Sequence, residues 1–324
     1  MTSASGHPPV RVALDLLGGD HAPEAVLDGA LLACGRRPDL AITLVGPPEQ
    51  AAAMLDARGR SGALTVAAAR EVVGMAEDPA RGVRRKRDAT VRVAARLVRD
   101  GAADAMVSVG STGAAMAAAV FTLGRLPGLT RPPLAAVVPA AAGPLVLLDV
   151  GSTVDSTADG LAQFALAGAA YAEVRLGLQR PRVGLLSNGG EPGKGDALRR
   201  AAHDLIAALP VDFVGNVEGH DVARGGVADV VVTDGFTGNV VIKVLEAATA
   251  PGAARTGAGA VLLGVDGVVV VGHGAADAAE VASCIEVAEQ AVTERLVART
   301  AGALAALVAR RRETAGLPVA VARA

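Results

Sequence analysis

The sequence predicts an α/β protein with a largely parallel sheet. Short β-rich apolar runs alternate with longer Ala/Leu/Arg stretches of helical character, which is the pattern of repeated strand-helix units. Several of the apolar runs continue directly into glycine-bearing polar turns. In a parallel sheet such turns meet at the carboxyl edge, where open α/β folds bind ligands. Tight strand-to-helix connections alone explain some of these glycines, but so many turns at one edge favour an anion-binding cleft. The turns are DLLGGDHAP, VSVGSTGA, LDVGST, LSNGGEPGKG, VTDGFTGN and VVGHGAA.

The apolar periodicity sets the expected order of elements. Strands are expected at residues 10–17, 41–45, 64–68, 105–109, 134–138, 145–150, 182–186, 213–214, 230–233 and 268–271. Helices are expected at 23–34, 49–57, 89–100, 113–123, 158–176, 195–208, 239–248 and 277–311. The Ala/Gly/Pro-rich stretch 248–260 is typical of a loop. We expect one α/β domain over 10–313, with room for two lobes, between a disordered N-terminus (1–9) and a tail (314–324).

Composition excludes several classes of protein. With 324 residues the chain can bury a large core, whereas a net charge of −2 and 2% aromatic residues do not suit a nucleic-acid-binding protein. No long uncharged apolar stretch lacks Pro and Gly breaks, so a transmembrane helix is not expected. The start MTSASGHPPV has neither the basic nor the apolar part of a signal peptide. Cys34 and Cys284 cannot form a disulfide framework, and we expect a cytoplasmic, reduced protein.

The stretch LSNGGEPGKG indicates a phosphate site. Gly189, Gly193 and Gly195 expose backbone N–H groups, and Lys194 adds a mobile positive charge before a predicted helix. The spacing does not fit a nucleotide P-loop, which needs four residues between its glycines and a Ser or Thr after the lysine. Only three of the 31 basic residues are lysines, Lys86, Lys194 and Lys243, so Lys194 stands out. The alternative is a tight turn whose lysine is solvated.

Two further turns carry polar side chains between glycines. In GSTGA, Ser111 and Thr112 precede a helix; capping accounts for one hydroxyl, and close approach of a ligand would account for the other. In GGDHAPE, His21 is a candidate general base or phosphate donor. The alternative, equally supported by the residue types, is that Asp20 caps the helix and His21 lies on the surface.

Carboxylates follow two other strands. Asp149 and Asp234 could each orient a lysine or histidine, bind a metal, or cap a turn. No His/Cys cluster has zinc spacing and no compact carboxylate run is present, so no metal is expected. A G-x-S-x-G elbow is also absent, since Ser108 lacks the glycine two residues before it. Bound phosphate can therefore itself be the nucleophile.

The run RGVRRKRDAT, residues 81–90, is the concentrated basic patch of the chain. Charge runs are commonly solvated faces. Functionally, such a patch can dock an acidic partner protein and speed the encounter.

Seven blocks of the sequence resemble, in order and spacing, the bacterial acyl-carrier-protein:phosphate acyltransferases of phospholipid synthesis (PlsX). The resemblance covers about residues 10–292. The blocks are ALDLLGGDHAPEAVLDGA, the stretch from EDPARGVRRKRDAT to VSVGSTGAAMA, LLDVGSTVD, RVGLLSNGGEPGKG, FVGNVEGHDV, ADVVVTDGFTGNVVIKVLEA and LLGVDGVVVVGHG.

This resemblance implies a three-layer α/β/α fold similar to isopropylmalate dehydrogenases and phosphate acetyltransferases. It also implies a homodimer without metal, nucleotide or other cofactor, in which inorganic phosphate attacks the thioester of a long-chain acyl group on acyl carrier protein. Acyl phosphate and free carrier protein are the products.

Residue roles are assigned on this basis. Lys194, His21, Asp234 and Lys243 are the expected catalytic residues: Lys194 for phosphate, His21 or Lys243 for the oxyanion or leaving thiolate, and Asp234 or Asp149 for orientation. The expected docking residues for the carrier protein are Arg81, Arg84, Arg85, Lys86 and Arg87. The expected phosphate and substrate contacts are Gly18, Gly19, Asp20, Gly110, Ser111, Thr112, Gly113, Asp149, Gly189, Gly193, Gly195, Asn216 and Asn239.

The chain departs from the family pattern at three turns and one segment. It has Ser111 in place of the family's Asn, Ser152 and Thr153 in place of Ala-Asn, and GEPGKG in place of EEEGKG. The segment 248–260 is shorter than the amphipathic helical segment common in the family, which argues against membrane contact. Three alternatives stay open: a diverged enzyme that uses acyl-CoA, a catalytically silent acyl-binding or regulatory protein, and a dehydrogenase on the same fold. The last lacks a G-x-G-x-x-G after its first strand.

Overall fold

The computed structural model describes residues 8–248 and 259–314. Most of the loop expected at 248–260, most of the N-terminus expected to be disordered, and all of the expected tail except residue 314 lie outside the described residues. The described chain divides into two compact units. The first comprises residues up to 124 together with 259–295, and the second comprises 125–248 together with 296–314.

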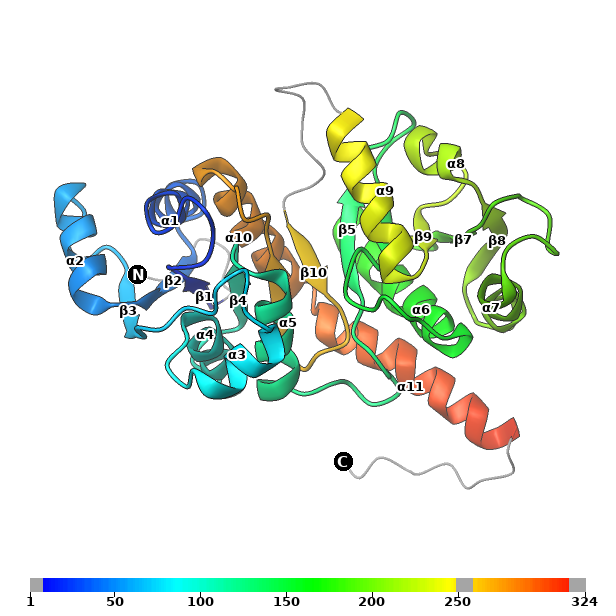
Figure 1. Ribbon diagram of the computed structural model, residues 1–324, viewed down its shortest axis with the longest axis horizontal. Coiled ribbons are helices and arrows are strands. Elements are labelled where there is room, and N and C mark those ends of the chain that lie inside the picture. The colour runs from blue at the N-terminus through cyan, green and yellow to red at the C-terminus, as the bar shows by residue number, and fades with distance from the viewer. Residues whose placement is uncertain (1–7, 249–258, 315–324) are drawn as a thin grey trace. The chain divides into compact units, whose positions relative to one another are not determined.

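The first unit is a sheet with the strand order β3-β2-β1-β4-β11-β10, parallel except for β10. Helices α1 and α10 pack together on one face and α3, α4 and α5 on the other (Figure 1). Its strands are β1 (Val10–Asp15), β2 (Leu40–Gly46), β3 (Thr65–Ala68), β4 (Ala105–Ser108), β10 (Ala260–Leu262) and β11 (Val268–Val271). Its helices are α1 (Glu24–Arg36), α2 (Pro48–Ala57), α3 (Pro79–Arg85), α4 (Thr90–Arg99), α5 (Thr112–Thr122) and α10 (Ala278–Thr293).

The second unit is a sheet with the strand order β5-β6-β9-β7-β8, in which β5 alone runs antiparallel to its neighbour. Helices α6 and α7 pack side by side, α11 packs against α6, and α9 contacts β6. Its strands are β5 (Leu134–Val138), β6 (Leu145–Leu148), β7 (Arg182–Leu186), β8 (Asp212–Val217) and β9 (Val230–Val232). Its helices are α6 (Ala158–Leu176), α7 (Ala197–Ala207), α8 (Gly219–Arg224), α9 (Gly235–Ala248) and α11 (Leu296–Thr314).

Burial of the central strands explains why the apolar runs form a parallel sheet. Strands β4, β6, β9 and β11 are buried at every residue. A strand covered by helices on both faces reads as a continuous Val/Ile/Leu run, and parallel sheets need such cover. The predicted three-layer α/β class is therefore confirmed.

The prediction of one long helix at 277–311 is wrong. Helix α10 ends at Thr293 and α11 begins at Leu296, in the other unit. Arg295 between them has φ = 57°, the left-handed conformation that breaks a helix. No Gly or Pro marks this break in the sequence, so the apolar periodicity alone could not reveal it.

Two glycines of the second unit test how closely its layers pack. Gly168 of α6 has no room for a side chain, because a Cβ there would lie 2.8 Å from Leu148 Cδ2 and Val230 Cγ1. Gly302 of α11 has open space around it. Alanine is favoured over glycine in a helix by about 1 kcal/mol. We therefore expect Gly302→Ala to stabilise the protein by roughly 0.5–1 kcal/mol and Gly168→Ala to destabilise it, because overpacking outweighs propensity.

Urea unfolding of the two variants beside the wild type measures both effects. Stabilisation by both substitutions would show that α6 does not pack against β6 and β9 as closely as the structure has it.

Candidate active site

The turn between β7 and α7, residues 187–196, presents backbone donors and Lys194. The N–H groups of Gly189, Gly190 and Gly193 make no hydrogen bond to any described part of the protein, and Lys194 is exposed. Gly195 has φ = 98°, and its N–H donates to Asn188 Oδ1 at 2.9 Å. The turn is thus held in shape while several donors remain available to an anion.

Two polar atoms beside this turn have no partner. Asn216 is 8% exposed, and its Nδ2 donates to the Glu191 carbonyl at 2.8 Å. Its Oδ1 and the buried Oγ of Ser187 make no hydrogen bond within the described residues. Unsatisfied buried polar atoms are uncommon and call for an explanation. A ligand or water bound at the turn would supply their missing partners.

The helix after the turn begins later than expected. The sequence predicted a start at Gly195, but α7 begins at Ala197 and is capped by Asp196, whose Oδ1 accepts from the Arg199 N–H at 2.8 Å. This carboxylate lies at the positive end of the helix. The helix N-terminus is therefore already occupied, and an anion here would depend on the glycine N–H groups and Lys194.

Arg199 joins two of the polar turns, although nothing in the sequence predicted this role. Its guanidinium donates to Asp196 Oδ2 at 2.7 Å, to Thr237 Oγ1 at 3.1 Å and to Asp234 Oδ2. The Arg199 side chain is 13% exposed and that of Asp234 is 8% exposed. An arginine on a predicted helix has no feature that marks it as buried, since long charged side chains usually face solvent.

Asp234 follows β9 and is held in its ionised form. Burial acts to raise its pKa, but hydrogen bonds from the Thr237 N–H and hydroxyl and from Arg199 outweigh burial. The pKa of Asp234 is therefore lowered. The carboxylate orients Arg199 directly, rather than a lysine or histidine.

Asp149 follows β6 and fixes the turn after it. It is fully buried and accepts hydrogen bonds from the N–H groups of Leu134, Gly151, Ser152 and Thr153, at 2.6 to 3.1 Å. Burial raises its pKa, and those hydrogen bonds only partly oppose the effect. Of the roles left open by the sequence, Asp149 takes that of a turn cap.

Asn239 and Gly238 of α9 bind the same turn from the helix. Asn239 Nδ2 donates to the Val150 carbonyl at 3.1 Å. A Cβ on Gly238 would lie 2.0 Å from the Asp149 carbonyl oxygen, so only glycine lets α9 approach this closely. Lys243, further along α9, is exposed.

The first unit brings together the turns after β1 and β4. A Cβ on Gly18 would lie 2.9 Å from the Gly110 nitrogen, so the two glycine turns touch. Gly18, Gly19, Asp20, Gly110 and Ser111 line a pocket of about 100 Å³.

Capping differs between the two helices that follow these turns. Ser111 Oγ caps α5 by accepting from the Ala114 N–H at 3.3 Å, whereas α1 has no side-chain cap. Asp20 therefore does not cap α1, and His21 is exposed. Thr112 and Gly113 form the first turn of α5.

Asp15 lines the same pocket and is a second residue that we did not predict from the sequence. It is 3% exposed, and its Oδ2 accepts from Ser108 Oγ at 2.8 Å. Ser108 Oγ in turn accepts from the Gly110 N–H at 3.2 Å. Burial raises the pKa of Asp15 against the hydrogen bonds that lower it. An aspartate that ends an apolar strand just before a glycine turn was the signal available in the sequence.

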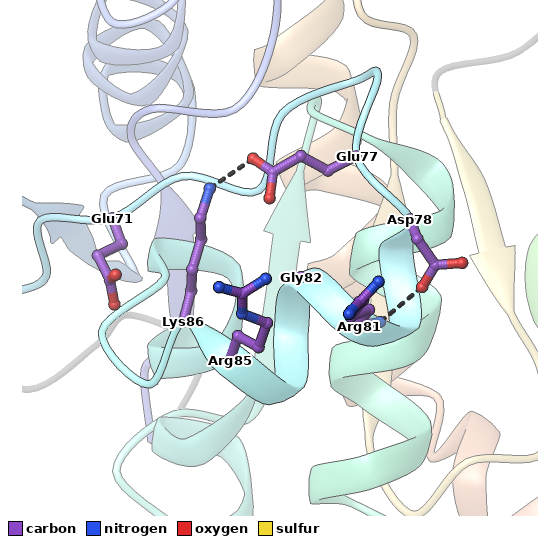
Figure 2. A pocket seen from close by; sticks show the side chains of 7 residues that line it. All are labelled: Glu71, Glu77, Asp78, Arg81, Gly82, Arg85 and Lys86. Atoms are coloured by element: carbon purple, nitrogen blue, oxygen red, sulfur yellow. Dashed lines mark hydrogen bonds and ion pairs between the residues drawn. The ribbon is translucent and has the colours of Figure 1, made fainter.

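The basic run forms α3 and the residues after it. Arg81, Arg84, Arg85 and Arg87 are exposed, and the Arg84 guanidinium lies 4.5 Å from the centre of the Phe121 ring. Arg81 and Arg85 line a surface pocket, and neither guanidinium has a partner drawn there (Figure 2).

Lys86 is the exception in this patch. Its ammonium binds Glu77 and the Val72 carbonyl, so it fastens the loop before α3 (Figure 2).

Neither cysteine is an activated nucleophile. Both are free thiols, and burial raises the pKa of Cys34 and raises the pKa of Cys284 to about 12. A thiol of this kind is protonated near neutral pH and reacts poorly. Over 8–248 and 259–314, no group of three or more His, Cys, Asp or Glu side chains lies close enough to hold a metal ion.

Comparison with known proteins decides the family. The model of a family described as "Fatty acid synthesis protein" matches residues 10–251. The chain is 40% identical to the phosphate acyltransferase of Desulfitobacterium hafniense, with 87% of this chain and 94% of that protein covered. The chain belongs to the phosphate acyltransferase family.

Other phosphate acyltransferases agree with this assignment. That of Pelotomaculum thermopropionicum is 42% identical, with 89% of this chain and 93% of that protein covered. That of Bacillus cereus strain G9842 is 47% identical, with 73% of this chain and 71% of that protein covered. The predicted family is confirmed, and the chain is an acyl-transferring enzyme.

Solved structures show the same fold at low sequence identity. A phosphotransacetylase from Streptococcus pyogenes has a TM-score of 0.69 at 19% identity, with 88% of this chain and 94% of that chain covered. A 4-hydroxythreonine-4-phosphate dehydrogenase from Klebsiella pneumoniae has a TM-score of 0.56 at 15% identity, with 90% of this chain and 99% of that chain covered. The phosphate acyltransferase thus shares its fold with phosphotransacetylases and with a dehydrogenase.

The lowered pKa of Asp234 predicts how stability depends on pH. The variant Asp234→Asn removes the charge that binds Arg199, and we expect it to lower the free energy of unfolding by about 2 kcal/mol at pH 7. An unfolded aspartate titrates near pH 4. Because folding lowers this pKa, the unfolded state binds more protons below about pH 5, and the wild type loses this stabilisation as the pH falls. The gap between variant and wild type should therefore narrow toward pH 3.

Urea unfolding between pH 3 and pH 7 measures that gap. A constant difference across the range would show that the ionised form of Asp234 has no special stability in the fold.

Proposed function

We propose that this phosphate acyltransferase transfers a long-chain acyl group from acyl carrier protein to inorganic phosphate in phospholipid synthesis. A phosphate oxygen attacks the thioester carbonyl carbon, the C–S bond breaks, and the carrier leaves as its thiolate and takes up a proton. Acyl phosphate and free carrier protein are the products. The relatives named phosphate acyltransferases support the reaction class, and the fold shared with phosphotransacetylases agrees with it.

The observation that carries this proposal is the turn at residues 187–196. Free glycine N–H groups, the exposed Lys194 and the unpaired atoms Ser187 Oγ and Asn216 Oδ1 gather there. A hydrogen phosphate ion can accept from the N–H groups and lysine and can donate its own O–H to an unpaired oxygen. In this assignment Lys194, Gly189, Gly193 and Asn216 form the phosphate site, and Gly195, whose N–H donates to Asn188, shapes the turn.

The remaining residues divide between chemistry and support. His21 and Lys243 are exposed candidate hydrogen-bond donors to the developing oxyanion or the leaving thiolate. One well-placed donor of this kind contributes about 10²- to 10³-fold in rate. Asp234 acts through Arg199, while Asp149 and Asn239 shape the neighbouring turn. The proposal requires no cofactor or metal.

The departures from the family pattern preserve these turns. Ser111 supplies the cap of α5 through its hydroxyl, and the Ser152 hydroxyl donates to the Pro132 carbonyl. The Ser152 and Thr153 N–H groups both bind Asp149. The substituted residues therefore keep the local geometry, which favours an active enzyme over a catalytically silent binding protein.

The carrier protein is assigned to the basic patch. Acyl carrier proteins are acidic, and Arg81, Arg84, Arg85 and Arg87 are exposed on and beside α3. Complementary charge speeds encounter and selects the partner. Acyl-CoA is the alternative donor, and it would not need this patch.

Assembly and location complete the proposal. No helix over the described ranges is long and apolar enough to cross a membrane. Phe236, Val240 and Val244 are 64%, 49% and 61% exposed and lie four residues apart along one face of α9. An exposed apolar stripe of this kind favours an interface with a second copy of the chain. We assign a cytoplasmic homodimer without membrane contact.

Lys194 provides the direct test of the phosphate site. Lys194→Met removes the charge but keeps the aliphatic stem that packs on Gly189. We expect the KM for phosphate to rise about 10- to 100-fold, the effect of losing one charge-assisted hydrogen bond, with little change in the KM for palmitoyl-carrier protein. Phosphate-dependent release of the carrier thiol measures both constants, and Lys194→Arg, which keeps the charge, serves as the matched control. An unchanged KM for phosphate in the Met variant would remove Lys194 from the site.

Charge reversal tests the docking patch. The double variant Arg81→Glu/Arg85→Glu should raise the KM for palmitoyl-carrier protein at least about tenfold at low salt, and less at high salt because ions screen exposed charges. The KM for palmitoyl-CoA, which needs no carrier contact, should change little. Equal effects on both donors would indicate general damage to the site, and no effect on either would place the carrier elsewhere.

A further inference from the structure

The pocket of the first unit has the wrong charge for phosphate. It lies at the carboxyl ends of β1 and β4, has a volume of about 100 Å³, and is lined by two carboxylates, Asp15 and Asp20. No Lys, Arg or His is among the residues that line it. A phosphate dianion there would meet negative charge without a cation to offset it. The turns of this pocket therefore favour a neutral ligand group, although the sequence alone predicted phosphate contacts.

One oxygen of a buried carboxyl group in the pocket lacks a hydrogen-bond partner. Asp15 is 3% exposed, and its Oδ2 is bound to Ser108. Its Oδ1 makes no hydrogen bond within the described residues. A buried carboxyl oxygen without a partner is unfavourable, and a ligand donor would satisfy it.

Part of the pocket wall is apolar. Val72, Val73 and Met75 come from the loop before α3, and Val91 comes from α4. A space that holds only a few water-sized groups, with these apolar side chains along part of its wall and one buried unpaired acceptor, suits a short hydrocarbon segment that carries an N–H donor.

The pocket and the basic patch share one loop, residues 71–78. Lys86 binds the Val72 carbonyl and Glu77, and the Gly74 N–H donates to Glu77 Oε1 at 3.0 Å. A Cβ on Gly82 would lie 2.6 Å from Val73 Cγ1. The loop that forms one wall of the pocket is therefore packed directly against α3.

Helix α3 also packs against the start of α5, next to the glycine turn that follows β4. A Cβ on Gly113 of α5 would lie 2.6 Å from Pro79 Cγ at the start of α3. A protein docked on Arg81 and Arg85 would thus lie next to the loop 71–78 and the start of α5, which both supply residues that line the pocket.

We propose that this pocket binds the terminal, amide-bearing end of the pantetheine arm of the acyl carrier protein, and that Asp15 Oδ1 accepts a hydrogen bond from the arm's amide N–H. The inference rests on the proposed carrier-protein reaction. It assigns the pocket of the first unit to the neutral end of the donor substrate and not to phosphate. Asp15 is a binding residue for the donor substrate and takes no part in phosphate recognition.

Two unreactive thioethers that differ in one atom group test this contact. N-[2-(hexylthio)ethyl]acetamide carries the amide, and 2-(hexylthio)ethyl acetate replaces its N–H by oxygen. Both are used as inhibitors of phosphate-dependent thiol release from palmitoyl-carrier protein. In the wild type we expect the amide to inhibit about tenfold more tightly than the ester, the effect of one hydrogen bond to a buried acceptor.

Variants at position 15 assign the preference to its residue. In Asp15→Asn the amide oxygen accepts from Ser108, so the NH2 group takes the place of Oδ1 and the preference should be lost. Asp15→Leu has a similar shape without an acceptor and should lose the preference too. The KM for phosphate should stay within about twofold of the wild type in both variants. The exposed carboxylate variant Asp100→Asn is the control and should match the wild type.

The outcomes separate this inference from the proposed function. Equal inhibition by amide and ester in the wild type, or inhibition by neither, overturns the pantetheine pocket while carrier-dependent turnover persists. A preference that survives in Asp15→Leu overturns the role of Asp15. If Asp15→Leu does not fold, Asp15→Asn still decides, because the wild type must prefer the amide and Asp15→Asn must not. Absence of phosphate-dependent thiol release from the carrier would instead overturn the proposed function itself.

Discussion

Buried carboxylates at the ends of parallel strands hold the polar turns of this protein in place. Asp15 ends β1 and binds the turn after β4 through Ser108. Asp149 follows β6 and gathers four backbone N–H groups, and Asp234 follows β9 and binds Thr237 and Arg199. A carboxylate needs partners to be stable in a protein interior. Each of these residues therefore dictates the conformation of the glycine-rich segment beside it.

The same constraint explains the glycines. At Gly18, Gly110 and Gly238 a side chain would collide with a neighbouring turn or with the strand end below. Backbone packed this closely leaves N–H groups, rather than side chains, to contact a ligand. The consequence is clearest at residues 187–196, where the donors of Gly189, Gly190 and Gly193 stay free within the described structure.

Most of the architecture was predictable because a parallel sheet buried on both faces leaves a strong sequence pattern. Strands β5, β7 and β11 and helix α6 have the predicted limits. The short helices α3 and α8 and strand β10 were missed, because a few residues carry too little periodicity.

The site was predictable only in part, for a different reason. Residue type alone marks the glycine turns, Lys194 and Asp234 as candidates. The roles of Arg199 and Asp15 depend on their burial, which only tertiary packing creates. The start of α7 was misplaced because Asp196, and not a glycine, caps it.

The central claim is that phosphate attacks the thioester directly, without an acyl-enzyme. Rapid mixing of the enzyme with stoichiometric palmitoyl-carrier protein, with and without inorganic phosphate, tests it most directly. We expect no release of carrier thiol without phosphate, and equal amounts of thiol and palmitoyl phosphate when phosphate is present. A burst of thiol without phosphate, equal to the enzyme present, would reveal a covalent intermediate and contradict the account.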